Sequence, residues 1–145
     1  MYETIVAAID GSDTAYRAAS HAVDLAAEVG GTVHIVFVLE SKPTLTAVGL
    51  SGLEDTTTAE DYREYAHEHI GRVREQAEAK NVGTVSAVLQ GRPALEIIEY
   101  AADEDVDLIV VGAHGEDHGA ITSAILGSNT ERVVRRAETS VLVAR

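Results

Sequence analysis

The chain has 145 residues, enough for one domain, and its hydrophobic residues (46%) are almost all aliphatic because aromatic residues make up only 4%. It carries 24 acidic and 11 basic residues, and a surface with a net charge of −13 disfavours nucleic acids and anionic membranes as partners. With no cysteine, no basic leader and no apolar run near the roughly 20 residues of a membrane helix, the sequence predicts a cytoplasmic protein without disulfides.

Short apolar runs and one helical pattern alternate in the first part of the chain. Residues 2–9 contain a continuous apolar run, which predicts a strand buried on both faces. The turn-forming residues 10–13 follow, and a helix is predicted over 14–29. Residues 32–39 predict a second buried strand, and the long loop-like stretch 40–57 suggests a flap over a site. The predicted buried stripe of the helix consists of alanines at helical spacing: Ala15, Ala18, Ala19, Ala22 and Ala26.

The middle of the chain continues the alternation. A long helix is predicted over 58–80, and a third strand is predicted over 84–89. Pro93, which is acceptable in a first helical turn, begins another helix. The inward stripe of the long helix is predicted to be Tyr62, Tyr65, Ala66, His69, Val73 and Ala77, and that of the next helix to be Leu95, Ile98, Ala101 and Ala102.

The last part of the chain predicts two more strands and a short helix. Residues 107–111 form the most hydrophobic run, and 139–144 form the last one. Between them, Ser128 and Glu131 have the spacing of a capping box, which predicts a helix from Ser128 to about Ala137. Strands that alternate with helices predict a single α/β domain over 1–145, with an open parallel sheet covered by helices on both faces.

A ligand site is expected beyond the carboxyl ends of the central strands. Asp10, just after the first strand, can accept hydrogen bonds from ribose hydroxyls, and the backbone of Val38 can meet a base edge. Gly112 and Gly115 allow close approach of a phosphate, and Gly127 with Ser128 lies at a helix N-terminus, which favours an anion. The predicted nucleotide site comprises Ala8, Ile9, Asp10, Val38, Gly112, Gly115, Gly127, Ser128 and Asn129.

Structural roles compete with these assignments. Asp10 can simply close the turn or cap the first helix, Gly112 and Gly115 can be loop glycines, and the capping box already accounts for Ser128. Tyr62 and Tyr65 are expected to pack in the core or an interface, and His67 and His69 to be solvated. His114 and His118 could hold a metal ion, but loop residues need not share one face, so no metal site is predicted.

Two stretches of the chain resemble the universal stress protein family. Residues 1–26 (MYETIVAAIDGSDTAYRAASHAVDLA) are similar to the opening strand, turn and helix of that family. Residues 107–115 (DLIVVGAHG) and 127–145 (GSNTERVVRRAETSVLVAR) are similar to its closing strand, loop, helix and strand. The resemblance implies a Rossmann-like fold with strand order 3-2-1-4-5. It also implies a homodimer formed through the last strand, from Thr139 to Ala144.

The resemblance also implies a stress-response regulatory protein that binds ATP, with or without Mg²⁺. ATP-binding members of the family carry the motif Gly-x2-Gly-x9-Gly-Ser/Thr after the fourth strand. Gly112, Gly115, Gly127 and Ser128 match its anchors, but eleven residues separate Gly115 from Gly127, and these residues include the acidic pair 116–117. The alternative is therefore a dimeric stress-response interaction protein that binds other proteins and no nucleotide.

Enzymatic activity has little support in the sequence. It has no Gly-x-Ser-x-Gly elbow and no Gly-x4-Gly-Lys-Ser/Thr loop, so catalysis would be limited to slow ATP hydrolysis. Only two of the 11 basic residues are lysines, Lys42 and Lys80. An acid excess with few lysines favours a halophilic protein in a high-salt cytoplasm, where short-range screening quenches surface repulsion; an ordinary acidic protein is the alternative.

Overall fold

The computed structural model describes residues 1–40, 59–114 and 126–145, and most of the predicted flap lies outside these ranges. Parallel strands form a five-stranded sheet in the order β3-β2-β1-β4-β5, which confirms the predicted fold class and strand order. The elements are β1 (Thr4–Ile9), α1 (Asp13–Val29), β2 (Thr32–Glu40), α3 (Ala59–Ala79), β3 (Gly83–Gly91), α4 (Pro93–Asp103), β4 (Leu108–Gly112), α5 (Ser128–Arg136) and β5 (Ser140–Ala144).

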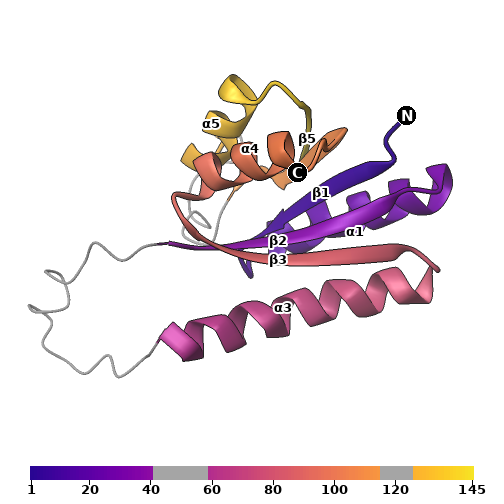
Figure 1. Ribbon diagram of the computed structural model, residues 1–145, viewed down its shortest axis with the longest axis horizontal. Helices are drawn as coiled ribbons and strands as arrows, with labels where there is room; N and C mark the ends of the chain where they lie inside the picture. The colour runs from indigo at the N-terminus through magenta and orange to yellow at the C-terminus, as the bar shows by residue number, and fades with distance from the viewer. Residues whose placement is uncertain (41–58, 115–125) are drawn as a thin grey trace, which may run out of the picture.

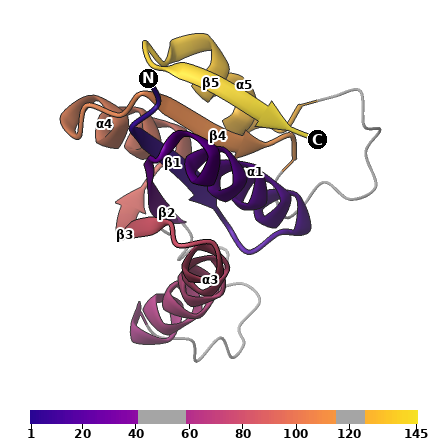
Figure 2. The same cartoon turned by 90° about the vertical axis from the view of Figure 1, so that its right-hand side faces the viewer.

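Helices cover both faces of the sheet, as Figures 1 and 2 show. On β1, Ile5 and Ala7 point to the face that α1 and α3 cover, whereas Val6 points to the face that α4 and α5 cover. All three side chains are fully buried. Two aliphatic cores on opposite sides of one sheet explain why the central strands are continuously apolar. None of the helices formed by the described residues is long and apolar enough to cross a membrane.

Helix α1 packs closely on the sheet because its inner face is made of small residues. All five alanines predicted for that face are buried. The Ser12 side chain caps the helix by accepting a hydrogen bond from the Ala15 amide (3.2 Å), and Gly30 ends it in the left-handed conformation (φ 76°). The short side chains bring the backbone of α1 near β1 and β4, which affects the site described below.

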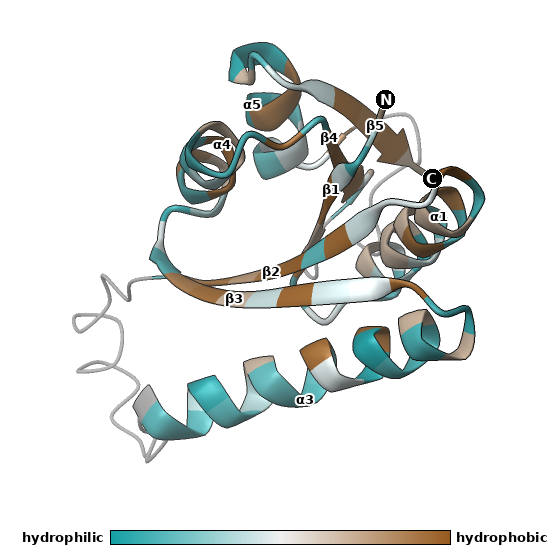
Figure 3. Cartoon of the chain, turned by 45° about the vertical axis from the view of Figure 1, so that its right-hand side comes forward, coloured by the Kyte–Doolittle hydropathy of each residue, from teal (hydrophilic) through white to brown (hydrophobic). Residues whose placement is uncertain are grey.

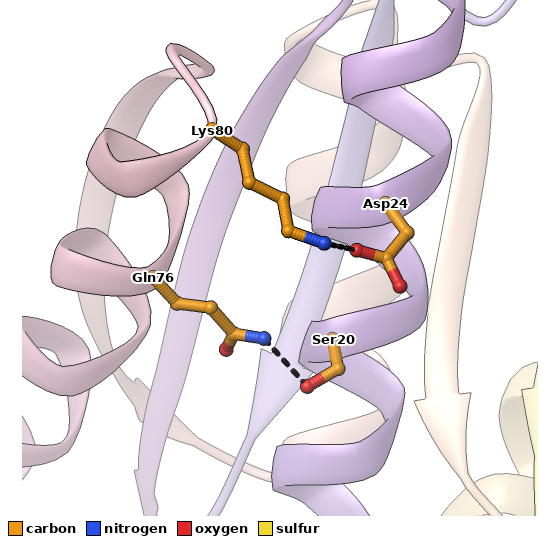
Figure 4. A network of polar contacts seen from close by, with 4 residues as sticks. All are labelled: Ser20, Asp24, Gln76 and Lys80. Carbon is orange, nitrogen blue, oxygen red and sulfur yellow. Dashed lines mark hydrogen bonds and ion pairs between the residues drawn. The ribbon is translucent and has the colours of Figure 1, made fainter.

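Helix α3 is amphipathic, with a narrow buried stripe. Ala66, Ile70, Val73 and Ala77 are completely buried, while most of the helix surface is hydrophilic (Figure 3). Two polar contacts tie the C-terminal end of α3 to α1 (Figure 4). Gln76 donates to the Ser20 hydroxyl (2.7 Å), and Lys80, just after the helix, pairs with Asp24.

The buried face of α4 differs from the prediction. Ala94 and Ile97 are buried, as is Ala101, but Leu95 is 47% exposed. Apolar residues occupy more than half of the helix circumference, so their spacing left the rotation of the helix undetermined. Contacts with β2, β3 and α5 decide it.

A polar pair links β2 to α4. The Nδ1 atom of His34 lies 2.7 Å from the hydroxyl of Tyr100, and the two rings meet edge to face. Burial lowers the pKa of His34 because it disfavours the charged imidazole, although Glu104 opposes the shift. Burial also raises the pKa of Tyr100, with Glu104 adding to the effect. Both shifts favour neutral groups, which suits a contact at the edge of the core.

Candidate functional site

A cavity of about 320 Å³, here called the main cavity, lies at the carboxyl ends of β1, β2 and β4. Its volume lies at the lower end of the range of roughly 300–1,000 Å³ found for small-molecule sites. Gly115, one of the nine predicted site residues, falls outside the described part of the chain. The other eight all line the cavity: Ala8, Ile9, Asp10, Val38, Gly112, Gly127, Ser128 and Asn129.

Asp10 has a structural role as well as a place in the cavity wall. Its Oδ1 atom accepts a hydrogen bond from the Ser12 amide (2.9 Å), which closes the turn between β1 and α1 around Gly11 (φ 91°). The helix cap is Ser12 and not Asp10. The single bond leaves Asp10 with acceptor capacity on a half-buried carboxylate.

The segment after β4 is fixed by hydrogen bonds from several elements. The Thr130 hydroxyl donates to the carbonyl of Gly112 (2.7 Å), and the Gly127 amide donates to that of Ala113 (2.8 Å). A Cβ atom on Gly112 would lie 2.8 Å from the carbonyl oxygen of Thr14, so α1 leaves no room for a side chain here. Gly112 is therefore explained by packing, independently of any ligand.

The N-terminus of α5 faces the main cavity without a side-chain cap. The N-cap residue is Gly127, and Ser128 is already helical and exposed, so the predicted capping box is wrong. Glu131 instead accepts a hydrogen bond from Arg135 (3.0 Å). The first intrahelical bond runs from the Glu131 amide to the Gly127 carbonyl (2.9 Å). The amides of the three residues 128–130 come before it and can therefore bind an anion.

The end of β2 supplies backbone groups and apolar surface. Its pairing with β1 ends at Phe37, opposite Ile9, whereas its pairing with β3 continues to Glu40. Beyond Phe37, the side of β2 that faces β1 therefore has no strand partner among the described residues. Val38 lies in this stretch and lines the cavity.

The aromatic wall of the site, which α3 and β2 form together, was not predicted from the sequence. Tyr62 and Tyr65 line the main cavity together with Phe37, and Tyr65 is 40% exposed. Its ring meets Phe37 edge to face, with 5.9 Å between the ring centres. Helical spacing placed both tyrosines on the inner side of α3, but it could not show that this part of α3 reaches the ends of the strands.

His69 is buried, which confirms its place in the predicted inward stripe of α3 and makes the other expectation, that it is solvated, wrong; His67 is exposed. The His69 ring packs against Tyr65, stacks on Phe37 and hydrogen-bonds through Nδ1 to the Tyr16 hydroxyl. Burial raises the pKa of Tyr16, and nearby Arg72 opposes the shift. This aromatic cluster packs against Tyr65 and Phe37 and so supports the wall of the main cavity that they form.

His114 lines the main cavity, and its carbonyl accepts a hydrogen bond from the Thr14 hydroxyl. His118, the other histidine considered as a metal ligand, lies outside the described residues, together with residues 116–117. Within the described ranges no group of three or more histidine, aspartate or glutamate side chains could hold a metal ion.

The family model of the universal stress proteins matches residues 1–145, the whole chain. The protein belongs to the universal stress protein family. A universal stress protein of Thermus aquaticus is 37% identical over 150 residues, with all of both chains covered.

Solved structures of universal stress proteins share the fold. The structure of MJ0577, a universal stress protein of Methanocaldococcus jannaschii, matches with a TM-score of 0.82 and 26% identity, over 99% of this chain and 96% of that one. A universal stress protein in complex with cAMP matches with a TM-score of 0.74 and 24% identity, over 99% and 97% of the two chains. One from Archaeoglobus fulgidus in complex with dAMP matches with a TM-score of 0.69 and 21% identity, over 100% and 98%.

Proposed function

We propose that this universal stress protein binds an adenine nucleotide, ATP with Mg²⁺, in the main cavity and acts as a nucleotide-responsive regulatory protein. The proposal rests on the fact that separate parts of the chain come together at one site. Eight positions selected for nucleotide chemistry, from four separate parts of the chain, line one cavity at the ends of β1, β2 and β4. The cavity lies where open parallel sheets bind ligands, beside the point where the strand order reverses.

Each part of a nucleotide has a matching surface in the cavity. The free side of β2 near Val38 offers backbone groups to a base edge, and Tyr65 and Phe37 offer apolar surface. Asp10 can accept from a ribose hydroxyl, and the uncapped amides of residues 128–130 can bind phosphate. Two relatives of the same fold were solved with the adenine nucleotides cAMP and dAMP, which supports the choice of base.

The alternative function is a stress-response interaction protein that binds no nucleotide. It is favoured by the eleven residues between Gly115 and Gly127 and by the two carboxylates at 116–117, which would repel a phosphate chain. Mg²⁺ or high salt offsets this repulsion. A nucleotide-binding experiment in the presence of Mg²⁺ and high salt therefore distinguishes the two functions.

Isothermal titration calorimetry with ATP, Mg²⁺ and molar KCl tests the proposal. We expect saturable binding of about one nucleotide per chain, and about tenfold weaker binding by Asp10→Asn, because an acceptor with full charge is lost while the turn is kept. Asp13→Asn is the matched control: Asp13 is exposed, lies three residues away and does not line the cavity. No heat and no shift in melting temperature at millimolar ATP would favour the alternative.

The proposal includes a homodimer formed through β5. This strand pairs with β4 alone in the described sheet, so its outer edge is open, and Leu142 is 38% exposed beside it. Size-exclusion chromatography with light scattering should give twice the chain mass for the unaltered protein and a smaller mass for Leu142→Arg. A dimer that survives Leu142→Arg but dissociates in Val85→Arg, on the opposite edge strand β3, would place the interface at β3.

A further inference from the structure

A second hollow of about 600 Å³ adjoins the main cavity between the first half of α4 and the length of α5, from Ser128 to its last residue, Arg136. We call it the arginine groove because Arg92, Arg132 and Arg136 line it. Arg92 comes directly before α4, while Arg132 and Arg136 lie one turn apart on α5. Four residues line both hollows, which makes the two continuous: Glu40, Pro93, Ser128 and Asn129.

The groove is locally basic in a strongly acidic protein. Three arginines line it against one carboxylate, Glu40, although the chain as a whole has a net charge of −13. Three other cations of the described residues pair with carboxylates: Arg72 with Glu68, Lys80 with Asp24 and Arg135 with Glu131. In the described part of the chain, no carboxylate pairs with any of the three groove arginines. Like charges held together without counter-charges repel one another, so an anion between them would be stabilising.

The backbone adds to this preference for an anion. Neither α4 nor α5 has a side chain that caps its first turn, unlike α1, which Ser12 caps. The amides of residues 128–130 in α5 therefore have no side-chain cap, and neither do those of Ala94 and Leu95 in α4, where Pro93 at the first position has no N–H. The positive ends of both helix dipoles lie at the groove, although Arg136 at the opposite end of α5 also lines it. The planar guanidinium of arginine also fits phosphate oxygens with two parallel hydrogen bonds, which favours phosphate over a small halide ion.

We propose that the arginine groove binds phosphate groups, namely the outer phosphates of a nucleotide whose nucleoside lies in the main cavity. This inference rests on the proposed function, and it adds a specificity for the length of the phosphate chain. The shared rim at Ser128 and Asn129 allows one ligand to span both hollows, with its inner phosphate at the start of α5. A free polyphosphate has the same chemistry and is the other source of such a group.

The test compares AMP, ADP, ATP and inorganic tripolyphosphate by calorimetry in the same Mg²⁺ and KCl. The variant is Arg132→Gln with Arg136→Gln, and the control is Arg17→Gln with Arg135→Gln. Both double variants lower the net charge equally, and both change exposed residues, but Arg17 and Arg135 line neither hollow. We expect the groove variant to bind ATP roughly 100-fold more weakly, about tenfold for each arginine, and AMP within about twofold of the unaltered protein.

The possible results separate the two sources of phosphate. If the groove variant loses affinity for ATP but not for AMP, the groove binds the outer phosphates of a nucleotide. If the groove variant, but not the control, loses affinity for tripolyphosphate while the ratio of its ATP and AMP affinities is unchanged, the groove binds a free polyphosphate. Equal effects of the groove and control variants on every anion would overturn the proposal. AMP binding that survives in all proteins keeps the proposed function intact, and tripolyphosphate tests the groove even if no nucleotide binds.

Discussion

Gly112→Ala should destabilise the protein because β4 and α1 approach each other too closely for a side chain. The added Cβ atom would lie 2.8 Å from the carbonyl oxygen of Thr14 and 2.9 Å from its carbonyl carbon. These are backbone atoms at the start of a helix and cannot move without moving α1. Overpacking of this kind costs about 1–3 kcal/mol, and the lower chain entropy of alanine in the unfolded state returns about 0.4–1 kcal/mol.

The net loss of unfolding free energy is therefore about 0–2.6 kcal/mol, with a middle value near 1 kcal/mol, and each kcal/mol corresponds to a melting temperature roughly 2–4 °C lower. Urea denaturation followed by circular dichroism measures it. The matched control is Gly71→Ala, within α3, where an added Cβ would have no atom within 4 Å. That variant should gain about 0.5–1 kcal/mol because alanine is the better helix former. If Gly112→Ala were as stable as Gly71→Ala, the close approach of β4 and α1 would be refuted.

Three further predictions concern folding. The lowered pKa of His34 means that protons bind the unfolded chain more strongly, so its contribution to stability is complete above about pH 6.5 and is lost as the pH falls through the folded pKa. Urea denaturation at several values between about pH 7.5 and 5 should show that the free energy of unfolding falls less steeply in His34→Gln than in the unaltered protein. Parallel pH dependences of the two proteins would contradict this. Lys80→Met removes the exposed pair with Asp24 and should cost at most about 1 kcal/mol in dilute salt and almost nothing in molar KCl; an equal loss in both would point to a packing role. Ser12→Ala should cost about 1 kcal/mol through the lost helix cap, and thermal denaturation equal to that of the unaltered protein would count against the cap.

Local patterns predicted some features well and others poorly. The strands and α1 were predicted closely because a buried parallel strand is a short continuous apolar run and an alanine stripe repeats with the period of a helix, and both patterns show in short segments. The face of α4 was mispredicted because Leu95 and Ile97 are equally apolar, and only contact with the sheet selects Ile97. The capping box failed at Ser128 because the hydrogen bond from the Gly127 amide to Ala113 places the cap one residue earlier.

The sequence by itself determined the class of fold, its membership of a family and the residues expected near a ligand, because these depend on short motifs and periodic patterns. Only the tertiary structure decided what lies beside those residues. Arg92 and Arg132, which line one groove, are 40 positions apart, and His69 and Tyr16, which share a hydrogen bond, are 53 positions apart. How whole helices pack on the sheet decides that each pair lies together. Packing is a property of long-range shape and charge, which no local pattern records, and it produced both the aromatic wall and the arginine groove.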